Sequence, residues 1–263
     1  MKIHVLMENS SSRPELTAEH GLSLLIECRG KCILFDTGAS PAFADNAERL
    51  GLDLSKVDAA VLSHGHYDHG GGLLRFLRDN HQAPVWVSPH AFDPHFNARG
   101  KDIGLPPGLK VHPQIRRVAG EQHTLYEGMT IYSAVPLPCT YPTEGSGMTA
   151  VIDGRSTEDD FRHEQYLLLE EGGRRVLISG CSHRGILNIA AHFRPDVLVG
   201  GFHLMRTDPV KDAPRLLEIA RQLLAIPAQY HTGHCTGEGV CALLCRLMGE
   251  RLQTFSTGTH LEL

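Results

Sequence analysis

Three histidines and an aspartate fall within six residues of this 263-residue sequence, at His64, His66, Asp68 and His69. Imidazole and carboxylate side chains together suit zinc, iron or manganese. His64 and His66 are two residues apart and can reach one ion together. Asp68 and His69 lie where a loop turns into a helix, so they point elsewhere and can serve a second ion. The segment therefore predicts a metal site.

The segments on either side of this cluster predict how it is held. Residues 57–62 are an apolar run typical of a buried strand, and residues 73–78 have helical periodicity. Gly65 and the glycines at 70–72 let the backbone turn tightly between them. The cluster is thus expected on a loop between a strand end and a helix start, where ligands can converge. An ordinary surface loop is the alternative, but four ligand side chains in this setting favour a metal site.

The composition is ordinary for a globular protein, with 41% hydrophobic and 21% charged residues. The formal net charge is −5 and there is no long basic run, which argues against nucleic acid and anionic membranes as partners. No stretch approaches the roughly 20 apolar residues that cross a bilayer. The seven cysteines are scattered without a Cys-x-x-Cys pair, which indicates free thiols in a reducing cytoplasm. We expect a cytoplasmic protein that acts on a small molecule, and the oligomeric state stays open.

The remaining chain alternates strand and helix patterns without a low-complexity linker, so a single domain over residues 1–263 is expected. Strands are predicted at 3–6, 22–28, 32–36, 85–87, 130–135, 165–170, 175–179, 196–199 and 252–255, and a loop at 136–147. Helices are predicted at 41–50, 185–193, 209–225 and 237–248. Helices thus lie outside two mixed sheets, and histidine-bearing loops follow strand ends. This arrangement is a layered α/β domain with its site at the sheet edge.

Residues from about 89 to 120 are irregular and rich in proline and glycine, which predicts an insertion over the site that acts partly as a lid. Its basic side chains either attract an anionic substrate or form a solvated face, and the second explanation is the commoner one. They are Arg99, Lys101, Lys110, Arg116 and Arg117.

Further candidates stand where other strands end. His183 follows the strand at 175–179, and His234 precedes the last helix, so both are expected to bind metal. Cys181 is either a thiolate ligand or a buried thiol. His203 is expected to contact substrate or transfer a proton, with a packing histidine as the alternative. Asp36 is expected to hydrogen-bond the neighbouring loop backbone. His231 is a weaker ligand candidate, and histidines 20, 81, 112, 123 and 260 are expected to be ordinary surface residues.

Five motifs occur in an order that resembles one branch of the metallo-β-lactamase superfamily. They are Phe-Asp-Thr-Gly at 35–38, Ser-His-Gly-His-Tyr-Asp-His-Gly-Gly-Gly-Leu at 63–73, Gly-Cys-Ser-His-Arg-Gly-Ile at 180–186, Gly-Gly-Phe-His-Leu at 200–204 and His-Cys-Thr-Gly at 234–237. Glu164-Gln165 adds to the likeness. That branch includes an archaeal synthase making ribofuranosyl-aminobenzene phosphate compounds and many uncharacterised bacterial metal-dependent hydrolases.

The resemblance implies an αββα sandwich with a two-metal cleft. It implies that His64, His66 and His183 hold one ion, and that Asp68, His69 and His234 hold the other. The histidine that usually forms the third motif, between the first cluster and the next strand pair, has no clear counterpart here. The branch carries an acidic residue where this chain has His163, so that position is not assigned its usual role.

Two divalent ions, with zinc ahead of iron or manganese, are the expected cofactors. Such ions lower the pKa of bound water and polarise a carbonyl or phosphoryl oxygen. Asp68 can accept a proton as well as bind metal, and His203 is the second catalytic candidate. The leading function is hydrolysis of an ester, lactone or phosphate-type bond in a small molecule, with an anionic substrate open. The alternatives are a transferase that joins an aminobenzoate or pterin unit to a sugar phosphate, a metal-bound sensor without turnover, and a redox di-iron centre.

Overall fold

A computed structural model gives the fold, and it describes residues 1–134, 137–143 and 147–263. The end of the predicted strand at 130–135 and parts of the predicted loop at 136–147 lie outside these residues.

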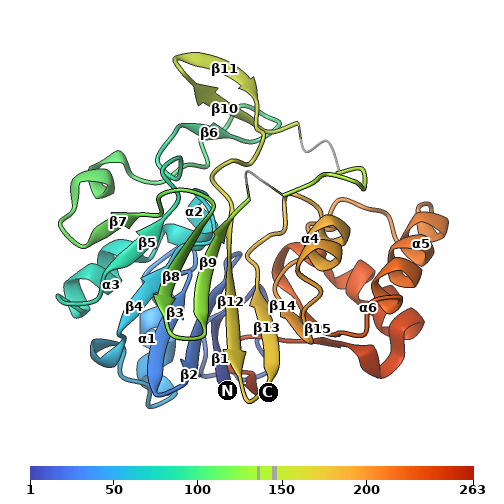
Figure 1. Ribbon diagram of the computed structural model, residues 1–263, viewed down its shortest axis with the longest axis horizontal. Helices are drawn as coiled ribbons and strands as arrows, with labels where there is room; N and C mark the ends of the chain where they lie inside the picture. The colour runs from blue at the N-terminus through green and yellow to red at the C-terminus, as the bar shows by residue number, and fades with distance from the viewer. Residues whose placement is uncertain (135–136, 144–146) are drawn as a thin grey trace.

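Two seven-stranded sheets form the centre of the molecule (Figure 1). In spatial order the first contains β17 (His260–Glu262), β1 (Lys2–Met7), β2 (Ser23–Cys28), β3 (Lys31–Phe35), β4 (Ala59–Val61), β5 (Val85–Val87) and β7 (Ile115–Arg117). The second contains β16 (Leu252–Thr254), β15 (Gln229–Thr232), β14 (Val197–Val199), β13 (Arg174–Ile178), β12 (Gln165–Glu171), β9 (Met129–Ser133) and β8 (Gln122–Tyr126).

The sheets pack face to face through their central strands, which are apolar on both sides. Ile26 and Phe35 from the first sheet join Leu167 and Val199 from the second in one buried cluster. Alternate residues of the same strands, such as Leu25, point outward into a separate cluster under the helices. Burial on both faces is what the continuous apolar runs of these strands require.

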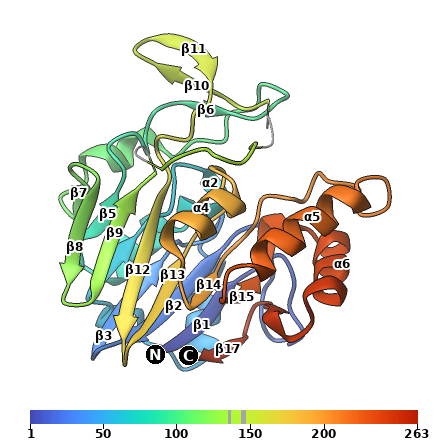
Figure 2. The same ribbon diagram turned by 45° about the vertical axis from the view of Figure 1, so that its right-hand side comes forward.

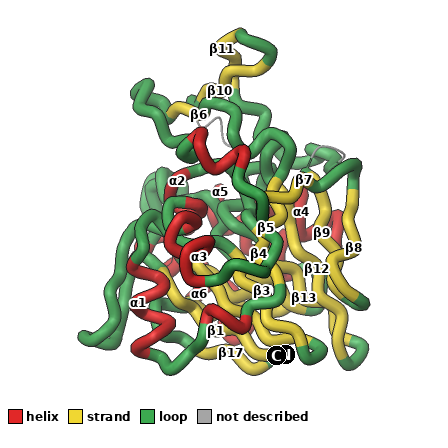
Figure 3. Tube along the Cα trace, turned by 90° about the vertical axis from the view of Figure 1, so that its left-hand side faces the viewer, coloured by secondary structure: helices red, strands yellow, loops and turns green. Residues whose placement is uncertain are grey.

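Helices cover the two outer faces. The first sheet carries α1 (Ala42–Arg49) and α3 (Leu73–Asp79), which are seen beside it in Figure 3. The second carries α4 (Ile186–Phe193), α5 (Ala213–Leu224) and α6 (Glu238–Met248), with α4 and α5 next to each other in Figure 2. These five helices agree with the predicted ones to within a few residues, and the predicted αββα sandwich is confirmed. No helix of the described residues is long and apolar enough to span a membrane.

Shorter elements complete the chain. A one-turn helix, α2 (Tyr67–Gly70), holds the end of the histidine cluster. The 3-10 turns are η1 (Leu54–Lys56), η2 (Pro107–Val111), η3 (His234–Thr236) and η4 (Gly249–Arg251). A small sheet of β11 (Arg155–Glu158), β10 (Thr149–Ile152) and β6 (His95–Phe96) stands above the two large sheets in Figure 1.

The segment at 89–120 divides between two sheets, because β6 joins the small sheet and β7 extends the first large sheet. Its role as a lid stays a prediction. The guanidinium groups of Arg116 and Arg117 donate hydrogen bonds to the backbone carbonyls of Pro113 and Lys110, and both side chains are exposed. These contacts favour the solvated-face explanation of the basic residues.

The strands that lead into the predicted motifs run parallel within each sheet. β3, β4 and β5 are parallel neighbours, and so are β13, β14 and β15. Parallel strands end at the same edge of a sheet, and ligands bind at that edge in open α/β sheets. The segments that follow β3, β4, β13, β14 and β15 therefore converge, and every predicted metal ligand lies on one of them, with Asp68 and His69 in α2 and His234 in η3.

Candidate metal centre

All six predicted ligands come together, in two neighbouring groups. One ligand atom each from His64, His66 and His183 lie within 4.8 Å of one another. A second group, with the same spacing, combines Asp68, His69 and His234 with Cys181. The ring centroids of His64 and His69 are 4.1 Å apart, so the two groups adjoin.

The unpaired nitrogens of the first group fit a metal ion. Among the described residues, His64 Nε2, His66 Nε2 and both ring nitrogens of His183 are buried without a hydrogen-bond partner. A buried polar atom without a partner is costly, and native proteins rarely leave one. Neutral imidazole nitrogens are preferred ligands of zinc and of divalent iron and manganese. The donor set therefore suits a divalent ion.

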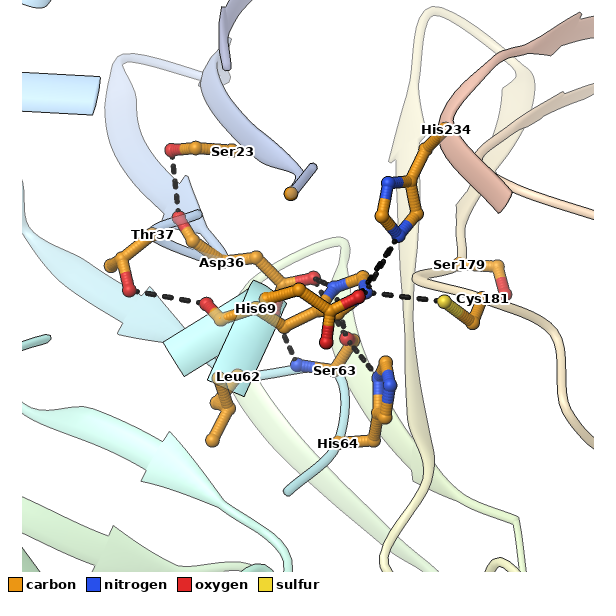
Figure 4. A network of polar contacts seen from close by, with 12 residues as sticks. Ser23, Asp36, Thr37, Leu62, Ser63, His64, His69, Ser179, Cys181 and His234 are labelled. Carbon is orange, nitrogen blue, oxygen red and sulfur yellow. Dashed lines mark hydrogen bonds and ion pairs between the residues drawn. The ribbon is translucent and has the colours of Figure 1, made fainter. Parts of the chain in front are cut away.

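Hydrogen bonds at Nδ1 leave Nε2 of three candidate ligands facing the centre (Figure 4). His64 Nδ1 lies 2.8 Å from Ser63 Oγ, and Ser63 Oγ donates to Asp36 Oδ2 at 2.7 Å. His69 Nδ1 lies 2.6 Å from Asp36 Oδ2. These contacts put the proton on Nδ1 of both rings, so that Nε2 offers a lone pair. His234 follows the same rule, with Nδ1 at 2.9 Å from Asn9 Oδ1.

Asp36 organises this network. Its Oδ1 accepts a hydrogen bond of 2.7 Å from the backbone N–H of Ser63, which confirms the predicted contact with the loop backbone. Its backbone takes a left-handed φ of 60° directly after β3, so that the carboxylate turns toward the next strand end. Gly180 on the opposite strand end allows close approach, since a Cβ there would lie 2.2 Å from Ser63 Oγ.

Substitution of Asp36 by asparagine is expected to weaken metal binding by about 10–100-fold, the usual effect of losing a hydrogen-bond partner of a ligand. The asparagine amide nitrogen cannot accept the His69 Nδ1–H. Competition with a chelator of known affinity measures the change. Asp45→Asn is the matched control, because Asp45 is half-buried on α1 and pairs with Arg75. Equal metal affinity in both variants would contradict the role assigned to Asp36.

The two groups differ in charge when no metal is bound. Burial holds the pKa of His64, His66 and His183 well below the usual value, so these rings stay neutral. Burial also disfavours the charged form of His69, but the carboxylates of Asp36 and Asp68 outweigh it and raise the pKa of His69 to about 9. The first group is thus ready for metal at neutral pH, whereas the second has a proton to release.

Two further side chains, Cys181 and His20, lie beside the six predicted ligands. Cys181 Sγ lies 3.2 Å from His69 Nε2, whereas burial raises the pKa of its thiol, so a thiolate ligand and a buried thiol both stay open. His20 is exposed, as expected of a surface residue, but it was not expected to contact the site, and its Nε2 lies 3.3 Å from Asp68 Oδ2. His231 is buried but belongs to no group of potential ligands among the described residues.

A trio of buried side chains supports the first group from the other side. His163 Nδ1 accepts a hydrogen bond of 2.9 Å from the backbone N–H of Gly65, between the ligands His64 and His66. The proton of His163 must then be on Nε2, which lies 3.3 Å from Asp159 Oδ2. His95 Nδ1 lies 3.1 Å from the same oxygen. Together with His66, these three side chains form another group whose potential ligand atoms lie within 4.8 Å of one another, but the proton on His163 Nε2 favours a role in positioning the ligand loop.

The sequence did not reveal this trio because His95 lies 64 residues before Asp159, on a different segment from Asp159 and His163. Gly65 also approaches the segment after β5 closely, since a Cβ on Gly65 would lie 2.2 Å from the carbonyl oxygen of Ala91. The one signal in the sequence that could have indicated the trio is His163, which stands where the branch has an acidic residue.

His203 borders the first group. Its ring centroid is 4.2 Å from that of His183, and its buried Nδ1 has no hydrogen-bond partner among the described residues. The preceding Phe202 is buried in the core of the second layer. A left-handed φ of 53° turns His203 the other way, and its backbone N–H donates to Cys235 Sγ at 3.3 Å.

Comparisons with known proteins agree with the fold. Residues 16–223 match the sequence model of the metallo-beta-lactamase superfamily. An uncharacterised protein of Methanocaldococcus jannaschii is 29% identical over 77% of this chain and 79% of its own. From the same organism, 7,8-dihydropterin-6-methyl-4-(beta-D-ribofuranosyl)-aminobenzene-5'-phosphate synthase is 27% identical over 90% of this chain and 88% of its own. The crystal structure of Tm1679, a metal-dependent hydrolase of the beta-lactamase superfamily, has a TM-score of 0.84 at 29% identity and covers 100% of this chain and 99% of its own.

Proposed function

This chain belongs to the metallo-β-lactamase superfamily, and we propose that it is a metal-dependent hydrolase of a small molecule with an ester, lactone or phosphate-type bond. The observation that carries the proposal is the pair of adjoining ligand groups. In the first group, four buried ring nitrogens of His64, His66 and His183 have no hydrogen-bond partner among the described residues. A cavity reaches this group at His183 and His203, so a substrate has access to the site. The similarity to the hydrolase Tm1679 supports the same activity.

In this proposal His64, His66 and His183 hold one ion, and Asp68, His69 and His234 hold the other. Cys181 lies within reach of the second group. Zinc is the expected ion, and iron or manganese would take the same ligands. Ions at these positions would supply activated water and polarise the substrate oxygen.

Asp68 and His20 give the water proton a route to solvent. Although burial favours protonation, contacts with His69, His20 and His234 hold the pKa of Asp68 well below its usual range, so the carboxylate does not retain a proton. The hydrogen bond to Asp68 raises the pKa of His20. A proton accepted at Asp68 Oδ2 can therefore pass to His20 Nε2, 3.3 Å away, and leave through the exposed side of that ring.

A transferase is the second candidate, because the 27% identical archaeal relative is a synthase of a ribofuranosyl-aminobenzene phosphate compound. Such a reaction needs a site for a sugar phosphate beside the ions. The basic residues at 89–120 are compatible with an anionic substrate. A sensor without turnover is less favoured, because the six candidate ligands are all present and lie together.

The test combines elemental analysis of the purified protein with a turnover screen on phosphodiesters, phosphomonoesters, esters and lactones. His66→Ala and His69→Ala are each expected to lose about one ion per chain and to lose hydrolysis. His81→Ala, which changes an exposed histidine, serves as the control. Full metal content in both ligand variants would refute the metal centre. Full metal content in the wild type without hydrolysis of any substrate would refute the hydrolase and direct attention to the synthase reaction.

A further inference from the structure

A cavity of about 720 Å³ adjoins the first ligand group, between α4, α5 and the loop after β14. This volume is typical of ligand pockets, which measure roughly 300–1,000 Å³. His183 and His203 are at its buried end, and Arg215 and Glu218 of α5 are exposed at its mouth. The cavity therefore borders the candidate metal centre at His183.

Apolar side chains form the walls of this cavity. They come from α4, from the loop after β14 and from α5, and they are Ile186, Leu187, Phe202, Leu204 and Ile219. All except Leu187 are buried against the core of the second layer, so the walls are held firmly by packing.

Several polar groups of the lining already have partners within the protein. Asn188 uses its amide to bind the backbone N–H and carbonyl of Tyr141, which attaches the loop at 137–143 to α4. Ser182 Oγ lies 2.8 Å from Ser179 Oγ. The Glu218 carboxylate accepts hydrogen bonds from Arg221 and Gln222. A ligand in the cavity thus meets apolar surface along the walls and the ring nitrogens of two histidines at the inner end.

The charges of the residues that line the cavity argue against a ligand with a strongly anionic group. Within the described part of the chain the lining includes one arginine, Arg215, and Glu218 lies one helical turn away with the opposite charge. A nucleotide or sugar phosphate would need several cations or a row of backbone N–H groups. Apolar walls instead stabilise the binding of an apolar group, because binding removes its surface from water.

We propose that the cavity between α4 and α5 binds an apolar acyl or aryl substituent of the substrate, so that the protein hydrolyses hydrophobic esters or lactones. This inference rests on the proposed function for the reaction, but the binding of an apolar group does not depend on it. The substituent lies along Ile186, Leu187 and Ile219 while the carboxyl carbon is at the His183 end. The oxygen of a water molecule bonds to that carbon, and the bond between the carbon and the alkoxy oxygen breaks. One proton of the water goes to the leaving alkoxy group, so that a carboxylic acid and an alcohol result.

The first test measures binding without chemistry. N-phenyl-1-naphthylamine, an uncharged fluorescent probe, is titrated into the protein as purified. Ile219→Trp and Leu187→Trp fill the cavity from opposite sides and are expected to weaken probe binding at least tenfold. Leu217→Trp is the matched control, because Leu217 is on the same helix as Ile219 and is 54% exposed. Two filling variants are used because Ile219 is buried and its replacement can prevent folding.

The second test is a series of 4-nitrophenyl esters from acetyl to octanoyl. Each methylene that enters the cavity is expected to raise kcat/KM roughly fourfold in the wild type and in Leu217→Trp. In Ile219→Trp and Leu187→Trp, kcat/KM is expected to change little with the length of the acyl chain. Equal probe binding in all four proteins, or a flat series in an active wild-type enzyme, would overturn the inference. Absence of ester hydrolysis in every protein would overturn the assignment of hydrophobic esters as substrates, and the probe titration would still decide whether the cavity binds an apolar group.

Discussion

Replacement of His203 by alanine is expected to lower turnover by about 10²–10⁴-fold, the usual contribution of one acid–base group, while metal content and fold are retained. The ring lies between the cavity and the first ligand group, with its centroid 4.2 Å from that of His183. Its Nδ1 is buried without a partner, so it is available to a developing oxyanion or a leaving group. The six candidate metal ligands, which do not include His203, already suffice for two ions.

The measurement pairs steady-state kinetics with elemental analysis of the same preparation. His192→Ala, which removes an exposed histidine on α4, is the control. His203→Gln keeps a hydrogen-bond donor and is expected to recover part of the lost rate if stabilisation of the oxyanion dominates. Loss of an ion in His203→Ala would make His203 a ligand, and unchanged turnover would make it a packing residue.

The affinity for the second ion is expected to rise about tenfold per pH unit between pH 7 and pH 9 and then to level off. His69 has a pKa of about 9 in the metal-free protein, so at pH 7 an incoming ion must displace its proton. The first ion should show no such slope over this range, because burial keeps the pKa of His64, His66 and His183 well below its usual value.

The sign of the stability change in the metal-free protein follows from the same shift. A raised pKa of His69 stabilises the fold fully below the unfolded value of about 6.5, and this stabilisation is lost as the pH rises toward 9. Metal-free protein should therefore unfold at lower temperature at pH 9 than at pH 6.5, while metal binding strengthens over the same interval.

Calorimetry in buffers of different ionisation enthalpy counts the protons released when the second ion binds, and one is expected at pH 7. His69→Gln removes the titrating group and should abolish the slope, whereas Asp45→Asn, which changes a half-buried residue of α1, should leave it unchanged. An identical pH dependence for both ions would contradict the difference in charge between the two groups.

The sequence by itself was enough to identify the family, the sandwich and the six candidate ligands. It succeeded where the information is local, because an apolar run followed by glycine and histidine specifies a strand, a tight turn and a ligand within ten residues. The strand before His64 and the strand before His183 are both of this kind. It failed at β15, where Gln229–Thr232 is half polar and becomes a strand through pairing with β14 and β16.

Only the tertiary structure decided which side chains surround those ligands. Asp159 meets His95 from 64 residues away, and Cys181 meets His69 from 112 residues away. His20 reaches Asp68 from a polar loop that has no periodic pattern. Such contacts arise because the strand ends of two sheets meet at one edge. The spacing of residues along the chain encodes where each strand ends, whereas the packing of the two sheets determines which loops face one another.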